Sequence, residues 1–332
     1  MSIDYNPLVS VILPVYNGQP YLTTALESLR SQTYNNFEII VINDGSTDNS
    51  IDIINSFELP NMRVFSRENH GLAATLNRGI ELSQGKLIAR MDQDDVSEPD
   101  RLDKQVEFFA LHPEIGVAGT GYKLIDTQGN TLGLRQPPCC PREIERRLFV
   151  GNALVHGSVM FRRELIEQAG NYSVSEKLED YHLWSRLIGI IQMANLPNIL
   201  YGYRYNVPGS MVDQNFRQYN LEKNRLRDEL WKRSFPPVPW GDFQSIDNRF
   251  RQISRVRAYL DSTAKFSKNK FNRSEREYYL LTSLGIAREA VQRQHRSIAI
   301  REYITALLTH WGDFLITAKI IRHMFTSLIG NR

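Results

Sequence analysis

Apolar runs and helix-spaced apolar residues alternate along the first 95 residues of the chain. Nearly continuous apolar stretches at residues 9–15, 37–42 and 86–91, with a shorter one near 62–65, are typical of strands buried on both faces of a parallel sheet. Between them, apolar residues recur at helical spacing at 20–31, after residue 48 and at 71–82. This order predicts an α/β fold with a doubly wound, mostly parallel sheet and right-handed crossovers.

The pattern is more mixed after residue 110. We expect a hairpin formed by residues 116–125 and a turn at 128–130, helices at 143–149 and 179–188, and a strand at 155–161. From Asp213 onward the pattern is mostly helical, with a break at the proline-rich residues 236–239. The chain is therefore divided into residues 1–110, residues 111–212 and a C-terminal helical extension, residues 213–332.

The composition is that of an ordinary globular protein, with 42% hydrophobic and 23% charged residues among 332. The two cysteines, Cys139 and Cys140, are adjacent, a spacing that suits neither a disulfide framework nor a zinc site. No uncharged apolar run approaches the roughly 20 residues of a membrane-spanning helix, and the N-terminus lacks the basic start and apolar stretch of a secretory signal. We therefore expect a cytoplasmic protein.

Charge is distributed unevenly, although the net charge is only +3. Residues 213–332 carry 22 Lys and Arg against 12 Asp and Glu, a net of +10, which leaves −7 for residues 1–212. Such a basic helical surface is either a solvated face or a contact for anionic lipid at the inner face of the plasma membrane. Residues 303–329 have an amphipathic pattern that suits packing on the catalytic domain, a homodimer contact or an interfacial helix. We expect no nucleic-acid partner.

Acidic and turn-forming residues follow the predicted strands at their carboxyl ends, where open α/β sheets bind ligands. Asp92, Asp94 and Asp95 follow the fourth strand. Three carboxylates so close together repel one another, and the hard cations Mg²⁺ and Mn²⁺ prefer oxygen ligands. A solvated acidic turn would look the same in sequence, but its place at this edge favours a metal site. Asp44 follows the second strand, where it can accept a hydrogen bond from a nucleobase imide or simply serve turn chemistry.

Four motifs in order, spread over about 95 residues, resemble the family 2 glycosyltransferases of the GT-A fold. A later pair of motifs is similar to the acceptor half of bacterial members that build surface polysaccharides. The resemblance extends over roughly residues 8–205 and does not include the C-terminal extension. The six segments are PVYNG at 14–18, SLRSQTYNNFEIIVINDGSTD at 28–48, NHG at 69–71 with Asn77, IARMDQDD at 88–95, HGSVMFRR at 156–163 and LEDYHLW at 178–184.

The resemblance implies a donor site in residues 1–110, the nucleotide-sugar-binding half of a GT-A domain. Asp44 is expected to recognise the base. Asp92 is expected near the donor ribose, and Asp94 on a Mn²⁺ or Mg²⁺ ion that bridges the diphosphate, with Asp92 as a second metal ligand. The remaining residues expected to bind the donor are Pro14, Tyr16, Asn17 and Asn69.

Residues 111–212 then correspond to the acceptor-binding half, with Asp180 in the position of the general base. Glu179, Trp184 and His156 are candidate acceptor residues; Trp184 lies one helical turn after Asp180, on the same helix face. Each has a plainer explanation. Glu179 and Asp180 also suit the acidic start of a helix, and a lone histidine is often a packed polar residue.

The resemblance implies transfer of one sugar from a nucleoside diphosphate sugar to an acceptor hydroxyl, with inversion at the anomeric carbon. The acceptor would be a glycan or a lipid-linked acceptor in cell-surface polysaccharide or glycolipid synthesis. A UDP-sugar is favoured because Asp44 suits an imide, although thymidine shares that edge and guanosine stays open. The Gln-x-x-Arg-Trp motif of chain-elongating members is absent from the sequence, which favours non-processive transfer. Relatives often carry a histidine at the position of Asn206, and this chain does not.

Two other classes remain open. A nucleotidyltransferase also uses a doubly wound sheet and a metal, but the turn at residues 15–20 has one glycine and no Lys or Arg for a phosphate loop. A non-catalytic scaffold that binds nucleotide-sugar or membrane would not need the full set of expected carboxylates. The glycine signatures of dehydrogenases and P-loop proteins are missing.

Overall fold

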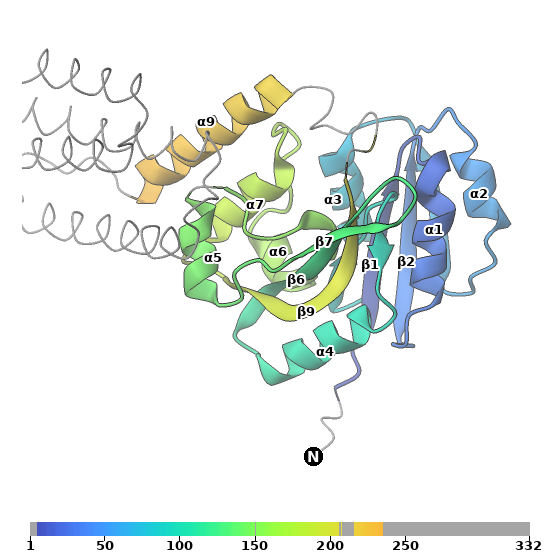
Figure 1. Ribbon diagram of the computed structural model, residues 1–332, viewed down its shortest axis with the longest axis horizontal. Helices are drawn as coiled ribbons and strands as arrows, with labels where there is room; N and C mark the ends of the chain where they lie inside the picture. Colours follow the sequence, from blue (N-terminus) through green and yellow to red (C-terminus); the bar gives the residue numbers. More distant parts are fainter. Residues whose placement is uncertain (1–4, 150, 206, 208–215, 235–332) are drawn as a thin grey trace, which may run out of the picture. The chain divides into compact units, whose positions relative to one another are not determined.

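The computed structural model describes residues 5–149, 151–205, 207 and 216–234 (Figure 1). The chain divides into two compact units, Met1–Pro237 and Val238–Arg332. The expectations for residues 236–239 and 303–329, for Asn206 and for most of the extension 213–332 lie outside the described residues. Everything below concerns the first unit.

Four parallel strands form one half of the sheet, as the apolar runs predict. The Val9–Val15 run, for example, is buried along its whole length. Residues 9–90 thus build a parallel α/β half with sheet order β3-β2-β1-β4. The strands are β1 (Val9–Val15), β2 (Phe37–Asp44), β3 (Met62–Arg67) and β4 (Leu87–Arg90).

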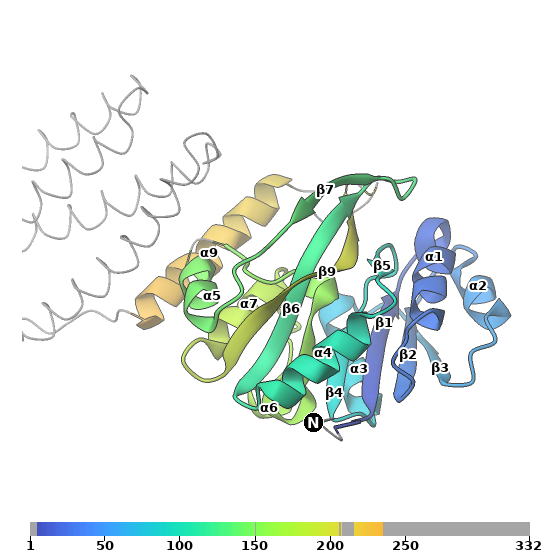
Figure 2. The same cartoon turned by 60° about the horizontal axis from the view of Figure 1, so that its bottom comes forward.

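The connecting helices cover both faces of these strands. Helices α1 and α2 lie on one side, while α3 lies on the other and packs against β1 and β2 (Figures 1 and 2). This split follows from right-handed crossovers, because the chain moves outward from β1 to β3 and then returns past β1 to β4. The helices are α1 (Gln19–Arg30), α2 (Ser50–Ser56) and α3 (Leu72–Leu82).

The second half of the sheet is mixed. Strand β8 joins the two halves because it pairs antiparallel with both β4 and β6, while the long strands β6 and β9 run parallel to each other. The expected hairpin is confirmed as β6–β7. The elements are β5 (Val96–Ser97), α4 (Arg101–Leu111), β6 (Ile115–Ile125), β7 (Thr131–Arg135), α5 (Pro141–Leu148), a 3-10 turn (His156–Ser158), β8 (Met160–Arg162), α6 (Arg163–Gln168), α7 (Glu179–Leu187), β9 (Gln192–Arg204) and α9 (Phe216–Ser234).

Two parts of this half differ from the prediction. The strand expected at 155–161 is wrong over most of its length: Ser158 N–H donates to the Val155 carbonyl at 2.9 Å, and a tight turn precedes a three-residue strand. The 13-residue strand β9 has no clear signal in the sequence. Polar residues such as Asn195 and a register shift where it pairs with Thr120 and Gly121 interrupt its alternation.

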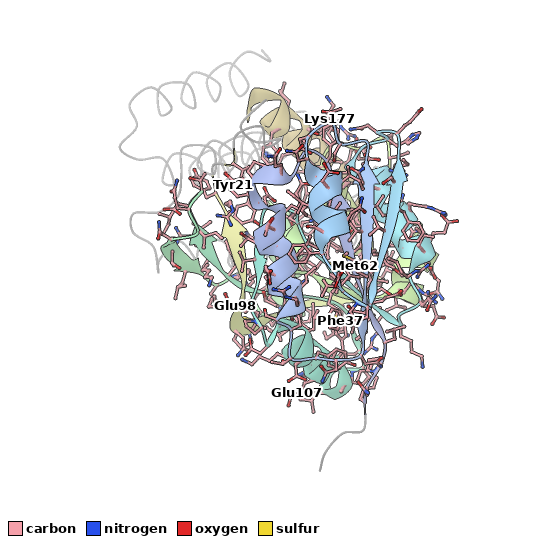
Figure 3. The ribbon with its side chains drawn as sticks, turned by 90° about the vertical axis from the view of Figure 1, so that its right-hand side faces the viewer. Tyr21, Phe37, Met62, Glu98, Glu107 and Lys177 are labelled. Carbon is pink, nitrogen blue, oxygen red and sulfur yellow. The ribbon has the colours of Figure 1, made fainter. Side chains whose placement is uncertain are left out.

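The carboxyl ends of the parallel strands meet at one edge. In Figure 3, Phe37 and Met62 mark the opposite, starting ends of β2 and β3, whereas Tyr21 and Lys177 lie toward the carboxyl edge. The described part of the chain contains no helix long and apolar enough to cross a membrane.

Candidate active site

Three turns at the carboxyl edge are joined by hydrogen bonds. The Gln93 side chain accepts a hydrogen bond from Tyr16 N–H at 2.8 Å and donates one to the Tyr16 carbonyl at 3.0 Å. Asn17, which has a left-handed φ of 50°, accepts from Thr47 N–H at 2.8 Å and donates its own N–H to Ser46 Oγ at 3.0 Å. The turns after β1, β2 and β4 therefore form one connected surface.

Asp44 ends β2 and is almost fully buried. Its carboxylate receives a hydrogen bond from Arg67 Nε at 2.7 Å and backbone hydrogen bonds from His70 and Gly71, the latter at 2.9 Å. A carboxylate has about four acceptor sites, so these three donors leave little capacity for a further one. Asp44 thus holds the 67–71 loop at the edge where a base would bind.

The other residues expected in the donor site lie along this edge with different exposures. Tyr16 is 48% exposed, and Asn17 and Asn69 are also exposed. Asn69 accepts from Gly71 N–H at 3.1 Å and so belongs to the same loop as the partners of Asp44. Pro14 lies inside β1 and is buried. Tyr16, Asn17 and Asn69 can touch a ligand directly, whereas Pro14 shapes the strand beneath.

The acidic turn after β4 places its carboxylates in three different environments. Asp92 is partly exposed and forms an ion pair with the fully buried Arg90. Burial and the charge of Asp92 raise the pKa of Asp94 to about 6. Asp95 is 1% exposed and accepts the Arg204 N–H at 2.7 Å, and its burial raises the pKa of its carboxyl well above the usual range. Asp95 is therefore a structural residue.

Asp92 and Asp94 suit a divalent cation that also binds substrate. Among the described residues, no group of three or more His, Cys, Asp or Glu side chains could hold a metal ion by itself. Mg²⁺ and similar ions commonly take one or two carboxylates and complete their shell with phosphate oxygens and water. Burial and, after it, the negative charge of Asp92 disfavour the charged form of Asp94 and raise its pKa, and a bound cation would favour that charged form. The carboxylates of Asp92 and Asp94 therefore fit a cation that is bound together with a diphosphate.

Arg204, at the end of β9, fixes the acidic turn and was not predicted as a site residue. Its guanidinium donates to the backbone carbonyls of Asp94 and Asp126, both at 2.7 Å, and lies 4.5 Å from the centre of the Tyr21 ring. The two hydrogen bonds join residues 110 and 78 positions apart, so no local pattern could have revealed them.

The His156–Ser158 turn lies directly beside the acidic turn. A Cβ atom on Gly157 would come within 2.0 Å of Tyr201 Oη and 2.7 Å of Asp92 Oδ2. Tyr201 Oη in turn accepts the Asp92 N–H at 3.2 Å. Glycine is thus the residue that lets this turn approach Asp92.

His156 belongs to this turn and contacts Glu179, the residue before the predicted base Asp180. Its Nδ1 lies 3.5 Å from Glu179 Oε1, and its Nε2 lies 3.0 Å from the Tyr172 hydroxyl. Burial and Arg90 lower the pKa of His156 well below its ordinary value, and burial with the charge of Asp180 raises the pKa of Glu179 to about 8. These shifts favour the uncharged forms of His156 and Glu179 near neutral pH, and Asp180 stays the base candidate of the pair.

Asp180 is held by Asn152, a residue that no sequence pattern indicated. Asn152 Nδ2 donates to Asp180 Oδ2 at 2.5 Å, and Tyr181 N–H donates to Asp180 Oδ1 at 2.6 Å. Burial raises the pKa of Asp180, and these two hydrogen bonds act against that rise. The result is a fixed carboxylate with increased proton affinity.

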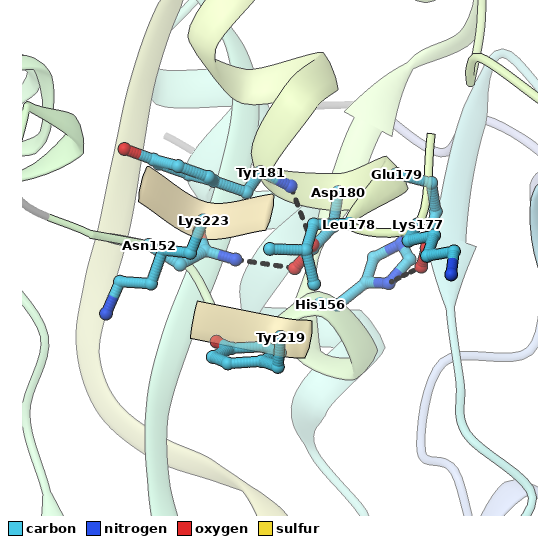
Figure 4. Close-up of a pocket in the computed structure, with 9 residues that line it drawn as sticks. All are labelled: Asn152, His156, Lys177, Leu178, Glu179, Asp180, Tyr181, Tyr219 and Lys223. Carbon is cyan, nitrogen blue, oxygen red and sulfur yellow. Dashed lines mark hydrogen bonds and ion pairs between the residues drawn. The ribbon is translucent and has the colours of Figure 1, made fainter. Parts of the chain in front are cut away.

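Asp180 and its neighbours line a cavity of about 150 Å³. Figure 4 shows Asp180 between Asn152 on one side and the His156–Glu179 contact on the other. Trp184, a candidate acceptor residue, does not line this cavity: it is fully buried and packs edge-on against His156, with ring centroids 6.3 Å apart. The lining residues are Asn152, His156, Lys177, Leu178, Glu179, Asp180, Tyr181, Tyr219 and Lys223.

Comparison with known protein sequences gives one consistent class. The model of Glycosyl transferase family 2 matches residues 10–170. The Amylovoran biosynthesis glycosyltransferase AmsE of Erwinia amylovora is 31% identical over 226 residues, which are 66% of this chain and 84% of that protein. The O-antigen biosynthesis glycosyltransferase WbnJ of Escherichia coli is 30% identical over 240 residues, 70% of this chain and 93% of that protein. An uncharacterized glycosyltransferase of Rickettsia conorii, 32% identical over 61% of this chain, is longer, and the match spans 35% of it.

Solved structures share the fold. Residues 1–349 of Staphylococcus aureus TarS in complex with UDP-GlcNAc superpose with a TM-score of 0.58 at 18% identity, covering 96% of this chain and 90% of that one. The mannosyltransferase PcManGT of Pyrobaculum calidifontis, in complex with GDP-Man and Mn²⁺, superposes with a TM-score of 0.55 at 16% identity, covering 99% and 89%. The α/β, GT-A fold is confirmed by these glycosyltransferases.

Proposed function

The chain belongs to Glycosyl transferase family 2 and is a glycosyltransferase, and from this premise we propose an inverting, metal-dependent, non-processive transfer from a nucleoside diphosphate sugar to an acceptor hydroxyl. Relatives named for amylovoran and O-antigen biosynthesis support a role in making cell-surface polysaccharide. A UDP-sugar is the favoured donor, as in the TarS complex, while the GDP-Man complex of PcManGT keeps guanosine open.

One observation supports this reaction most directly. The acidic turn with Asp92 and the cavity with Asp180 are linked by the turn at residues 156–158, because Gly157 lies against Asp92 and His156 contacts Glu179. A donor diphosphate on the first site and an acceptor on the second would therefore meet at this junction.

The residues of the two sites would then have different roles in the reaction. Asp180, held by Asn152 and Tyr181 N–H, accepts the proton of the acceptor hydroxyl. The hydroxyl oxygen forms the bond to the anomeric carbon as the bond to the diphosphate oxygen breaks. With one base and no carboxylate nucleophile proposed, a single displacement inverts the anomeric centre. A cation on Asp92 and Asp94 would neutralise charge that develops on the leaving diphosphate.

The test is a transfer assay that follows nucleoside diphosphate release from UDP- and GDP-sugars with and without Mn²⁺. Asp180→Asn should lower acceptor-dependent release by at least about a hundredfold, the usual contribution of a positioned base, and should still bind donor. Asp94→Asn should lose donor binding and transfer together. The matched control is Asp52→Asn, an exposed aspartate on α2.

The proposal fails if the folded wild-type protein releases no diphosphate from any nucleotide sugar. Full activity of Asp180→Asn would reject this residue as the base. Transfer that is indifferent to chelation of divalent cations would reject the metal.

We also propose that the basic segment 213–332 attaches the enzyme to anionic membrane surfaces, which would suit a lipid-linked acceptor. Deleting residues 300–332 should reduce co-sedimentation with phosphatidylglycerol vesicles. Unchanged co-sedimentation would remove these residues from membrane binding and favour their use in a homodimer or in packing on the catalytic domain.

A further inference from the structure

Helix α9 closes one side of the cavity around Asp180, although it lies beyond the segment that the family model matches. Tyr219, Lys223, Leu226 and Leu230 recur at intervals of three and four residues and so share one face of the helix. Leu226 and Leu230 are each 2% exposed, and α9 packs against α7, the helix that carries Asp180. The face that docks α9 is therefore the face that carries Tyr219 into the cavity.

Two polar contacts fix α9 in the same place. Arg225 forms an ion pair with Glu176, in the segment that leads into α7, and the Arg233 guanidinium donates to the Ser185 carbonyl. Contacts near both ends of the docked face hold the helix along α7. The position of Tyr219 relative to Asp180 is thus determined by packing and does not depend on Tyr219 itself.

Tyr219 and Asp180 face the same space. Both line the cavity, and Figure 4 shows the Tyr219 ring and the Asp180 carboxylate on different sides of it. Burial and, after it, the charge of Asp180 raise the pKa of the Tyr219 phenol. An aromatic ring thus lines the same cavity as the predicted base.

The cavity is polar at its flanks and aromatic on one side. Asn152, Lys177 and Lys223 supply polar groups, and Tyr219 supplies the ring. A pyranose has the complementary surface: C–H groups gather on its faces and hydroxyls around its rim, and the face of an aromatic ring is negative and attracts C–H groups. The volume of about 150 Å³ is below the roughly 300 Å³ at which pockets for drug-sized ligands begin, so the cavity is small.

We propose that Tyr219 is the platform on which the acceptor sugar stacks, so that the acceptor is a glycan whose terminal pyranose presents its hydroxyl to Asp180. This inference rests on the proposed function and names its acceptor class. It assigns acceptor recognition to α9, a helix outside the family-matched segment.

The experiment compares Tyr219→Phe, which keeps the ring, with Tyr219→Leu, which keeps much of the apolar volume and removes the ring. Leu221→Ala is the matched control because Leu221 is 63% exposed on the same helix. The acceptors are p-nitrophenyl hexopyranosides and, as a sugar-free probe, a short-chain polyprenyl phosphate. KM for the acceptor, KM for the donor and acceptor-independent donor hydrolysis are measured for each variant.

Tyr219→Leu should raise KM for the best hexopyranoside about tenfold, the order expected for one aromatic contact. Leu221→Ala should stay within about twofold of wild type in every measured value, and Tyr219→Phe, which keeps the ring, should raise KM for the acceptor less than Tyr219→Leu does. The proposal is overturned if Tyr219→Leu keeps the wild-type acceptor KM, if the polyprenyl phosphate is a better acceptor than every hexopyranoside, or if wild type hydrolyses donor and uses no hexopyranoside. Absence of diphosphate release from every nucleotide sugar in wild type, both with and without acceptor, would instead reject the proposed function.

Discussion

One side-chain contact, between Asn152 and Asp180, fixes the orientation of the predicted base. Asn152 Oδ1 accepts the Leu154 N–H at 3.3 Å, and its Nδ2 donates to Asp180 at 2.5 Å. The backbone donor fixes which way the amide faces, because a flipped amide would set two donors against each other and two oxygens against each other. The contact therefore holds the carboxylate in one orientation in the cavity.

Replacing Asn152 by Ala should lower kcat by about tenfold or more, because Asp180 loses a hydrogen bond to its charged form. That hydrogen bond lowers the pKa of Asp180, so its removal should move the acidic limb of the pH–rate profile to higher pH. Measured profiles of Asn152→Ala and of the exposed control Asn198→Ala test this. A reduced rate with an unmoved limb would mean that Asn152 acts only on packing.

Because the pKa of Glu179 is raised in the folded protein, we expect the free energy of unfolding to depend on pH. This pKa is about 8 in the folded protein against an ordinary 4.5, so between these values the folded state holds one more proton than the unfolded state. The stabilising contribution of Glu179 to the free energy of unfolding is fully present below pH 4.5. It is lost as the pH rises toward 8, by about 1 kcal/mol per pH unit.

Glu179→Gln should therefore gain stability relative to wild type as pH rises, which denaturant unfolding at pH 5.5 and 7.5 would measure. The exposed Glu164→Gln is the control. A constant difference between Glu179→Gln and wild type across this range would contradict the prediction.

At the scale of elements, short turns rather than helices and strands bring the two halves of the site together. The His156–Ser158 turn contacts Asp92 through Gly157 and Glu179 through His156. The HGS sequence is visible in the chain, but its contact with Asp92 depends on the pairing of β8 with β4.

Gly157→Ala tests that turn. Because the added Cβ would lie 2.0 Å from Tyr201 Oη and 2.7 Å from Asp92 Oδ2, either the turn or these two side chains must move. We expect a loss of stability of about 1–3 kcal/mol and, from the displacement of Asp92, weaker donor binding. Gly133→Ala is the control, since its nearest neighbour at 3.3 Å is the end of the Arg135 side chain. Unchanged donor affinity in a folded Gly157→Ala protein would show that the close approach of this turn does not affect donor binding.

At the scale of the molecule, donor binding should be visible as stabilisation of the folded chain. A nucleoside diphosphate with Mn²⁺ at about 100 times its dissociation constant should add about 2.7 kcal/mol. We expect a thermal shift with one base only, UDP being favoured, and none in Asp94→Ala. An equal shift in that variant, or a shift without divalent cations, would contradict the assigned cation site.

The parallel half of the fold and the meeting of the expected donor-site residues at one edge of the sheet follow from the sequence alone. Each buried strand there is a continuous local run, and parallel strands align their carboxyl ends, so the order of the strands is enough to assign Asp44, Asp92 and Asp94 to one edge. The four spaced motifs indicate the family for the same reason, because each is a short stretch read directly along the chain.

Which residues support that chemistry is decided by tertiary contacts. Asn152 meets Asp180 across 28 positions and Arg204 meets the acidic turn across about 110. Tyr219 reaches the cavity only because α9 docks on α7, and Trp184, which shares a helix face with Asp180, lies fully buried instead. Such contacts depend on mixed strand pairing and helix docking. Because these join segments that are distant in the sequence, no local pattern of residues predicts them.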